Sequence, residues 1–334
     1  MGGGQMSKSR EAVFFRQLDN NRVICDLCPR NCIIDNNQTS VCRSRKNING
    51  KLFSENYGKI TAYRMDPIEK KPLLHYYPGK RIFSIGSFGC NLHCQFCQNH
   101  EIAHGNPHFI ETTPENLADI AENEKNNIGI AYTYNEPIIW FEFLMDIMPL
   151  VNKSGLKNIL VTNGYIEEKP LEILLEHVDA MNIDLKGFSD HFYKSFCGSD
   201  LNPVKKTIKK ASNVCHVEIT TLIVPGLNDT KEEMEHMARW LSSIDPSIPL
   251  HLSRYFPSYK LNLPETDIDT LYGLQVEAKK FLEYVYIGNV SQVDMNTYCP
   301  RCNNLVVERN GSSNIKGLKD GNCTTCEYSI NIRY

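Results

Sequence analysis

Long apolar runs and a large excess of charge are both absent from this chain of 334 residues. The formal net charge of -3 creates no field that would attract nucleic acid or an anionic membrane. No apolar stretch approaches the ~20 residues that a membrane-spanning helix needs. The opening letters MGGGQMSKSR lack the apolar core of a signal peptide, and Met6 stands where the myristoylation pattern requires Ser or Thr. We therefore expect a cytoplasmic protein without a membrane anchor.

Cysteine, by contrast, is plentiful, with 13 residues in the chain. All but two of them fall into three clusters with metal-ligand spacing, which favours reduced thiols over a disulfide framework. The two solitary cysteines, Cys197 and Cys215, are expected to be small buried residues.

The central cluster has the spacing C-x3-C-x2-C and consists of Cys90, Cys94 and Cys97. It follows a short apolar run, which predicts a buried strand that delivers the three thiols in one loop. A four-iron cluster needs four ligands, so three thiols leave one iron open to bind a small molecule directly. The alternative is a zinc knuckle with His93 or His100 as the fourth ligand, but structural zinc sites usually combine paired C-x2-C units. We therefore favour a catalytic iron–sulfur cluster.

The first cluster has the spacing C-x2-C-x3-C-x9-C. Four thiolates in so short a stretch would hold a zinc ion or, alternatively, a second iron–sulfur cluster, and we favour zinc. Four ligands close either kind of site, so we expect no catalysis there. The cysteines are Cys25, Cys28, Cys32 and Cys42.

The last cluster consists of two C-x2-C pairs with twenty residues between them. This spacing is typical of a small ribbon that holds one tetrahedral zinc ion, and a rubredoxin-like iron is the alternative. The cysteines are Cys299, Cys302, Cys323 and Cys326.

Between these units, a short β-branched run, a turn and a longer amphipathic stretch alternate. This alternation predicts an α/β fold with a parallel sheet, here a partial (β/α)6 barrel that is shorter than a full TIM barrel. We expect a cysteine-rich segment at 1–79, the barrel at 80–292 and the ribbon at 293–334, with residues 57–81 crossing the barrel entrance. The predicted strands are 82–85, 128–134, 158–162, 178–184, 214–224 and 250–254, and the predicted helices are 114–125, 138–151, 170–176, 203–212, 230–242 and 271–282.

Polar side chains stand at or near the ends of the predicted strands, where a barrel of this kind carries its chemistry. Each also has a simpler interpretation. Glu136 would cap the next helix, and His251 would be a satisfied core histidine. Asp184 and Lys186 would form a structural ion pair. We expect the set to line a cofactor site: Asn135, Glu136, Thr162, Asn163, Asp184, Lys186 and His251.

The stretch CNLHCQFC resembles the radical S-adenosylmethionine (SAM) signature, with Phe96 at its aromatic position. The resemblance implies that the open iron of a [4Fe–4S] cluster chelates SAM. It also implies that the reduced cluster cleaves SAM to a 5′-deoxyadenosyl radical, which takes a hydrogen atom from a substrate. The letters YNE resemble the Gly-Gly-Glu motif that binds the SAM amino group in this superfamily. Here Tyr134 and Asn135 replace the glycines, and Glu136 is retained.

The order of motifs from CDLCPRNC through AYTYNEP, TNGY, IDLKGF and VPGLND to GNCTTC resembles the radical SAM member of the AmmeMemoRadiSam system. That family is similar in its core to pyruvate formate-lyase activating enzymes, and the resemblance implies Memo-like and AMMECR1-like partners. The chain departs from the family pattern in two places. His100 and Ala103 stand where the family usually has Trp and Ser, and Ser40 and Ser44 stand where glycine is common.

We therefore expect a radical SAM enzyme of oxidoreductase type, with flavodoxin or ferredoxin as electron donor and an unidentified substrate. A glycyl radical enzyme activase is one alternative, although cysteine units at both ends favour modification of a substrate. A nucleic-acid-binding protein stabilised by zinc is a second alternative, although the net charge and the lack of aromatic residues beside its basic helix face argue against it. That face consists of Lys205, Lys206, Lys209 and Lys210.

Overall fold

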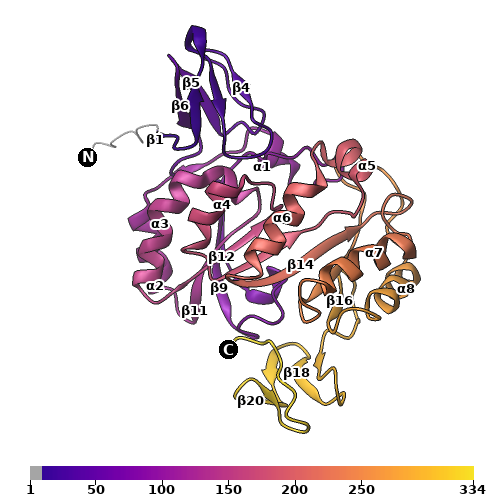
Figure 1. Cartoon of the computed structure of the whole chain (residues 1–334). Coiled ribbons are helices and arrows are strands. Elements are labelled where there is room, and N and C mark those ends of the chain that lie inside the picture. Colours follow the sequence, from indigo (N-terminus) through magenta and orange to yellow (C-terminus); the bar gives the residue numbers. More distant parts are fainter. Residues whose placement is uncertain (1–9) are drawn as a thin grey trace.

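A computed structural model describes residues 10–334, and the opening residues, including Met6, lie outside it. Its centre is an eight-stranded sheet (Figure 1). Every strand of this sheet is parallel to its neighbours except β8, which pairs antiparallel with β9 at one edge. The strands are β8 (Ala62–Pro67), β9 (Arg81–Gly86), β11 (Asn127–Tyr132), β12 (Lys157–Thr162), β13 (Ala180–Asp184), β14 (His216–Ile223), β15 (Leu250–Arg254) and β16 (Val285–Gly288).

Helices cover the outer face of this sheet (Figure 1). They form because their apolar residues recur at helical spacing, as in α6, where Leu201, Val204, Ile208 and Ala211 are buried. The N-termini follow the expected capping chemistry, since Thr113 Oγ1 accepts a hydrogen bond from a backbone N–H of α2. The helices are α2 (Pro114–Asn123), α3 (Phe141–Lys153), α4 (Glu168–Leu175), α6 (Leu201–Ala211), α7 (Lys231–Ser242) and α8 (Ile268–Ala278).

The predicted α/β fold is confirmed, and the structure adds two strands to it. β16 is only four residues long and follows the last helix. No amphipathic stretch comes after it, so the alternation that predicted the other strands is missing here. β8 lies in the segment that was expected to cross the barrel entrance. That expectation is wrong for residues 68–80, because the backbone N–H groups of Leu74 and His75 bind Glu218, near the start of β14. This segment therefore lies at the opposite end of the strands.

Small β units stand at the two ends of the barrel (Figure 1). The N-terminal unit lies beside α1 (His100–His104), and its apolar residues join the main core. The C-terminal unit lies at the far end and has a core of its own, together with Leu74, Tyr284 and Tyr286. The N-terminal strands are β1 (Arg10–Glu11), β2 (Phe15–Gln17), β3 (Val23–Cys25), β4 (Ile33–Ile34), β5 (Arg45–Ile48), β6 (Lys51–Ser54) and β7 (Lys59–Ile60), which pairs with β10 (Ile110–Glu111). The C-terminal strands are β17 (Thr297–Tyr298), β18 (Leu305–Arg309), β19 (Ser313–Ile315), β20 (Leu318–Lys319) and β21 (Asn322–Cys323).

Across residues 10–334, no helix combines the length and the apolar character needed to cross a bilayer.

Candidate active site

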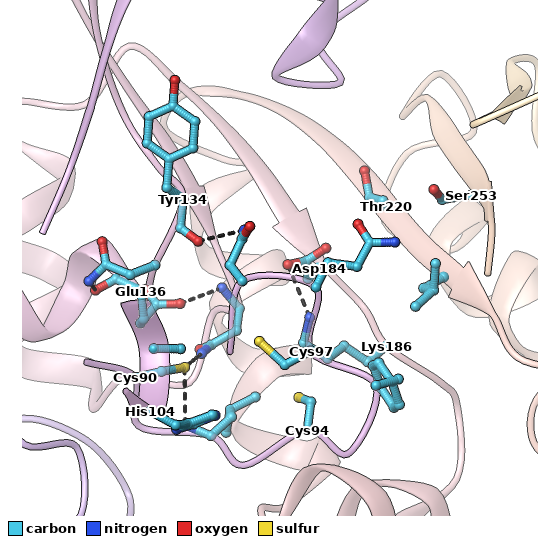
Figure 2. Close-up of a pocket in the computed structure, with 18 residues that line it drawn as sticks. Cys90, Cys94, Cys97, His104, Tyr134, Glu136, Asp184, Lys186, Thr220 and Ser253 are labelled. Carbon is cyan, nitrogen blue, oxygen red and sulfur yellow. Dashed lines mark hydrogen bonds and ion pairs between the residues drawn. The ribbon is translucent and has the colours of Figure 1, made fainter. Parts of the chain in front are cut away.

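The three cysteines that follow β9 line one cavity at the C-terminal ends of the parallel strands (Figure 2). Its volume is about 250 Å³. This cavity brings together most of the residues that the sequence placed at strand ends, from four different strand–loop junctions. They are Cys90, Cys94, Phe96, Cys97, Asn135, Glu136, Asn163, Asp184 and Lys186.

The three sulfurs around this cavity are too widely spaced to surround a single ion. Within residues 10–334, the four C-terminal cysteines are the only thiol, imidazole or carboxylate groups, three or more together, whose ligand atoms all lie within 4.8 Å of one another. A wider spacing is what a four-iron cluster requires, because each thiolate binds a different iron. The three thiols are therefore not gathered around one ion, as the zinc knuckle requires, and a polynuclear cluster is the kind of metal site that remains for them.

Gly89 allows the cysteine loop to turn away from β9. Its φ is +89°, and a Cβ at this position would lie 2.4 Å from the carbonyl oxygen of Cys42. The loop is then fastened to the segment after β13, since His93 N donates to Cys197 O at 2.9 Å and Gln95 N donates to Phe196 O at 2.9 Å. These backbone hydrogen bonds hold the loop over the strand ends.

Two side chains beside Cys94 complete this corner of the site. Phe96 is buried and packs against Phe192, with ring centroids 5.8 Å apart. Cys197 is fully buried, as expected, and hydrogen bonding from its thiol lowers the pKa of Cys94, while burial acts in the opposite direction. Sequence reasoning missed this contact because Cys197 lies far along the chain and belongs to no cysteine motif.

Glu136 lies in the cavity wall between β11 and β12 and accepts three hydrogen bonds there. Its Oε1 accepts hydrogen bonds from Thr162 Oγ1 at 2.6 Å and from Ile138 N at 3.0 Å, and its Oε2 accepts one from Asn163 N at 2.8 Å. Burial raises the pKa of Glu136 to about 7, although these hydrogen bonds act against the increase. The carboxylate therefore caps the following 3-10 turn, as the simpler interpretation held, and also faces the cavity. Thr162 is buried behind it and does not line the cavity.

Tyr134 keeps a backbone conformation that suits glycine. Its φ is +72°, in the left-handed region that glycine adopts without a steric penalty. The side chain is anchored away from the cysteines, since its hydroxyl donates to Asp66 Oδ2 at 3.1 Å and Lys71 Nζ lies 4.9 Å from its ring centroid. The Tyr134 carbonyl accepts a hydrogen bond from Asn99 Nδ2 at 2.7 Å. Tyr134 is thus held in this glycine-like conformation by the contacts of its side chain with Asp66 of β8 and with Lys71.

Asp184 and Lys186 form an ion pair on the cavity wall, with Nζ and Oδ2 3.1 Å apart (Figure 2). Although burial opposes it, the Asp184 carboxylate and the nearby Cys94 thiol raise the pKa of Lys186 well above its usual value. Lys186 is therefore a fixed cation beside the cysteine loop. Asn228 Nδ2 donates to the Lys186 carbonyl at 2.8 Å and holds the strand end in place.

His251 does not lie with the other candidate residues. It is buried near the start of β15, and its Nε2 bonds Glu218 Oε2 at 2.7 Å. Glu218 also binds His216 Nε2 at 3.0 Å, together with the Leu74 and His75 N–H groups. The assignment of His251 to a cofactor site is corrected here: the residue belongs to a buried cluster in the lower barrel. Ser253 and Thr220, which the sequence did not single out, line the cavity instead.

The other two cysteine clusters lie at opposite ends of the molecule. In the C-terminal cluster, Cys299 and Cys326 have sulfurs 3.5 Å apart, and Cys302 and Cys323 have sulfurs 3.6 Å apart. A tetrahedral ion with metal–sulfur bonds of about 2.3 Å places its ligands about 3.8 Å apart, so these four thiols form a site that could bind one metal ion. The N-terminal cluster, Cys25, Cys28, Cys32 and Cys42, lies beside the cysteine loop of the cavity.

The molecule is thus an open parallel barrel with three thiols, a carboxylate and an ammonium group around one cavity at its strand ends, an arrangement typical of a candidate metal-dependent enzyme. A family model described as the radical SAM superfamily matches residues 84–241, from within β9 into α7. The uncharacterized protein MJ0808 of Methanocaldococcus jannaschii is 44% identical over 308 residues, which cover 90% of this chain and 91% of that protein. The chain belongs to the radical SAM superfamily.

Activating enzymes are among the more distant relatives. The pyruvate formate-lyase-activating enzyme of Clostridium pasteurianum is 27% identical over 205 residues, which cover 58% of this chain and 85% of that enzyme. A crystal structure of a domain of pyruvate-formate lyase-activating enzyme from Bacteroides vulgatus has a TM-score of 0.43 and 20% identity, and it covers 48% of this chain and 99% of that domain. Superfamily membership supports an enzyme and implies a [4Fe–4S] cluster and SAM.

Proposed function

We propose that Cys90, Cys94 and Cys97 hold a [4Fe–4S] cluster whose fourth iron binds SAM in the cavity. The chemistry that cluster and SAM supply when bound is reductive cleavage of SAM to a 5′-deoxyadenosyl radical, which abstracts hydrogen from a substrate. One observation carries this proposal: three thiols, spaced too widely for a single ion, open onto one cavity with a carboxylate and an ammonium group on its wall.

The chain's own residues bind and orient SAM. Glu136 is locked by three hydrogen bonds, so its carboxylate is fixed where the amino group of SAM would lie beside the cysteine loop. Lys186 offers a fixed positive charge for the carboxylate of SAM, and Asp184 keeps that charge in place. Asn163 Nδ2 lies 3.7 Å from Cys90 Sγ and 2.9 Å from Asn91 Oδ1, so it positions the first ligand of the loop. Such preorganised contacts determine which bond of SAM faces the cluster.

We assign the chain to the radical SAM member of the AmmeMemoRadiSam system on the order of its motifs, with Memo-like and AMMECR1-like proteins as proposed partners and flavodoxin or ferredoxin as donor. The reaction is of oxidoreductase type, and zinc is the proposed ion of the C-terminal unit. We propose modification of a substrate rather than glycyl radical activation. Co-purification with a glycyl radical enzyme would contradict that choice.

The structure gives no support to a nucleic-acid-binding function. The basic face of α6 is engaged within the protein, because Lys210 pairs with Glu168 and Glu172. Lys205 Nζ lies 4.7 Å from the ring centroid of Phe188 and 4.9 Å from that of Trp240. These contacts account for Lys205 and Lys210, half of the basic face, without a phosphate backbone.

Release of 5′-deoxyadenosine tests the proposal. Anaerobically reconstituted, reduced protein is incubated with SAM, and the product is measured by mass spectrometry. We expect release from the native protein and none from Cys94→Ala. Cys215→Ala is the matched control, since this cysteine lies away from the cavity and its loss leaves release unchanged. Equal release from Cys94→Ala and the native protein would refute the cluster assignment.

A further inference from the structure

The four N-terminal cysteines form a cluster that is wider than a site for one metal ion. Cys25, Cys28 and Cys42 are buried, Cys25 N donates to the Cys32 carbonyl at 2.9 Å, and the thiols of Cys25 and Cys28 each lie close enough to that of Cys42 to interact with it, so the four side chains converge. Yet within residues 10–334, only the C-terminal cysteines bring three or more ligand atoms within 4.8 Å of one another. One ion would place its ligands about 3.8 Å apart. The N-terminal sulfurs are therefore not gathered around one ion as the C-terminal sulfurs are, which argues against the single zinc ion that the sequence favoured.

A buried arginine with unused donors faces these thiols. Arg45 is 1% exposed, and its Nη1 pairs with Glu142. Its Nε and Nη2 are buried and have no hydrogen-bond partner. The guanidinium group lies close enough to Cys25 and Cys42 for direct electrostatic interaction. Buried donors need acceptors, and the sulfurs of an anionic iron–sulfur cluster would supply them.

Two hydroxyl groups also surround the last cysteine of the set. Ser40 Oγ and Ser44 Oγ both lie 3.1 Å from Cys42 Sγ. Both serines are buried. Ser44 Oγ also donates to the Ile139 carbonyl at 3.3 Å, which leaves Ser40 as the freer donor to the sulfur. A hydroxyl group that donates to a ligating sulfur tunes the reduction potential of the cluster it binds. These contacts suit a redox centre.

The N-terminal cysteines are in direct contact with the cysteine loop of the cavity. The Cys42 carbonyl oxygen lies against Gly89, the residue before Cys90. Asn91 lies between the two sites: its side chain reaches Cys28, and its Oδ1 accepts from the same Asn163 amide that lies 3.7 Å from Cys90 Sγ. The two sets of thiols are thus joined through Asn91, Asn163 and the backbone contact between Cys42 and Gly89.

We propose that Cys25, Cys28, Cys32 and Cys42 ligate a second iron–sulfur cluster that passes electrons to the cluster on Cys90, Cys94 and Cys97. Four thiolates occupy all four irons, so this cluster is closed to substrate and carries only electrons. A low-potential one-electron donor of the ferredoxin or flavodoxin class gives it one electron, and it is reoxidised by giving that electron to the cavity cluster. No bond forms or breaks in this transfer. The relay rests on the proposed function, whereas the second cluster does not.

The first experiment isolates the N-terminal site. A chain with Cys90→Ala, Cys94→Ala and Cys97→Ala is reconstituted anaerobically with iron and sulfide. We expect about four iron and four acid-labile sulfide ions per chain, with a reduced electron paramagnetic resonance (EPR) signal that SAM leaves unchanged. Adding Cys28→Ala should remove them. A folded triple variant that binds zinc alone, or no sulfide, overturns the proposal. SAM cleavage is not measured here, so failure of the proposed function leaves this result intact.

The second experiment tests the relay. Cys25→Ala/Cys28→Ala protein is mixed with reduced flavodoxin or with dithionite, and reduction of the cavity cluster is followed by freeze-quench EPR. Reduction by flavodoxin should slow several-fold relative to the native protein, while reduction by dithionite should keep its native rate. Equal slowing with both reductants, or no slowing, contradicts the relay. If circular dichroism shows the double variant to be unfolded, Cys32→Ala replaces it, since this thiol is only half-buried.

Discussion

Thr162 Oγ1 donates a 2.6 Å hydrogen bond to Glu136 Oε1 and so joins the ends of two adjacent strands beneath the cysteine loop. The same hydroxyl oxygen accepts from Gly164 N at 3.1 Å. One threonine therefore fixes both the carboxylate of the cavity wall and the turn after β12. The position of Glu136 depends on this pair.

Thr162→Val should misplace Glu136 while it leaves the cysteines intact. Loss of the hydroxyl leaves a buried carboxylate oxygen short of a donor, which costs roughly 1–3 kcal/mol of unfolding free energy. We expect weaker SAM binding with full iron content, measured by equilibrium dialysis. The control is Thr266→Val, a buried threonine outside the cavity lining whose hydroxyl donates to the Ile223 carbonyl at 2.6 Å. The same affinity in both variants and the native protein would count against Glu136 as a SAM contact.

Glu218→Gln should reveal an acid-sensitive cluster in the lower barrel. Burial by itself would raise the pKa of Glu218, but hydrogen bonds from His216 and His251 outweigh it and lower the pKa below its usual value. A lowered folded-state pKa stabilises the fold above the unfolded value of about 4.3, and this contribution is lost as the pH falls below it. His75 also faces the cluster, through its backbone N–H.

The measurement is the difference in unfolding free energy between the native protein and Glu218→Gln at several pH values. We expect roughly 3–5 kcal/mol near neutral pH, because the histidine donors lose a charged partner. The difference should shrink below about pH 4, where the carboxyl group of the unfolded native chain is protonated. A difference that stays constant across this range would show that ionised Glu218 does not stabilise the fold.

Cys302→Ala should separate the C-terminal metal site from catalysis. The site lies at the far end of the barrel from the cavity, and its unit has its own small core. Because metal binding and folding of such a unit are coupled, we expect loss of its bound metal and a lower melting temperature. Release of 5′-deoxyadenosine per folded chain should persist. Loss of release from a chain whose barrel stays folded would assign this unit a catalytic role.

Ser40→Ala/Ser44→Ala should change the redox properties of the N-terminal centre without removing a ligand. Both hydroxyl groups contact Cys42 Sγ, and hydrogen bonds to a cluster sulfur stabilise its reduced form. We expect a lower reduction potential in an EPR-monitored titration of the chain that lacks the cavity cysteines. Ser54→Ala is the control, because Ser54 Oγ donates to Asn56 Oδ1 at 3.1 Å instead. An unshifted reduction potential would show that the two hydroxyl groups do not influence the redox centre.

Periodic features of the sequence were the most predictable. The alternation of β-branched and amphipathic stretches predicted the parallel barrel. The prediction that Asp184 and Lys186 stand at a strand end also places them where they line the cavity. Alternation gives the face of a strand but not the height of a residue along it. His251 is the second residue of β15 and so lies below the cavity, whereas Ser253 on the same face, two residues later, reaches it.

Contacts between distant segments could not be predicted from one sequence. Cys197 contacts Cys94 only because the segment after β13 that ends at Cys197 is hydrogen-bonded to the cysteine loop. In the sequence, Arg45 resembles a surface charge in a polar segment. In the structure it is buried beside Glu142 and two thiols. Cysteine spacing likewise predicted three metal sites but not the number of metal ions in each, because that number depends on the distances between sulfurs; within the described part of the chain, the C-terminal group is the one whose sulfurs the structure gathers around a single point.

The proposed function requires a cavity cluster that leaves one iron free for SAM. The most direct test is the EPR spectrum of the reduced protein that lacks the N-terminal ligands Cys25 and Cys28, recorded with and without SAM. We predict that SAM changes the spectrum of the remaining cluster, because the amino and carboxylate groups bind its open iron. A fully loaded cluster whose spectrum is the same in both samples would contradict the account.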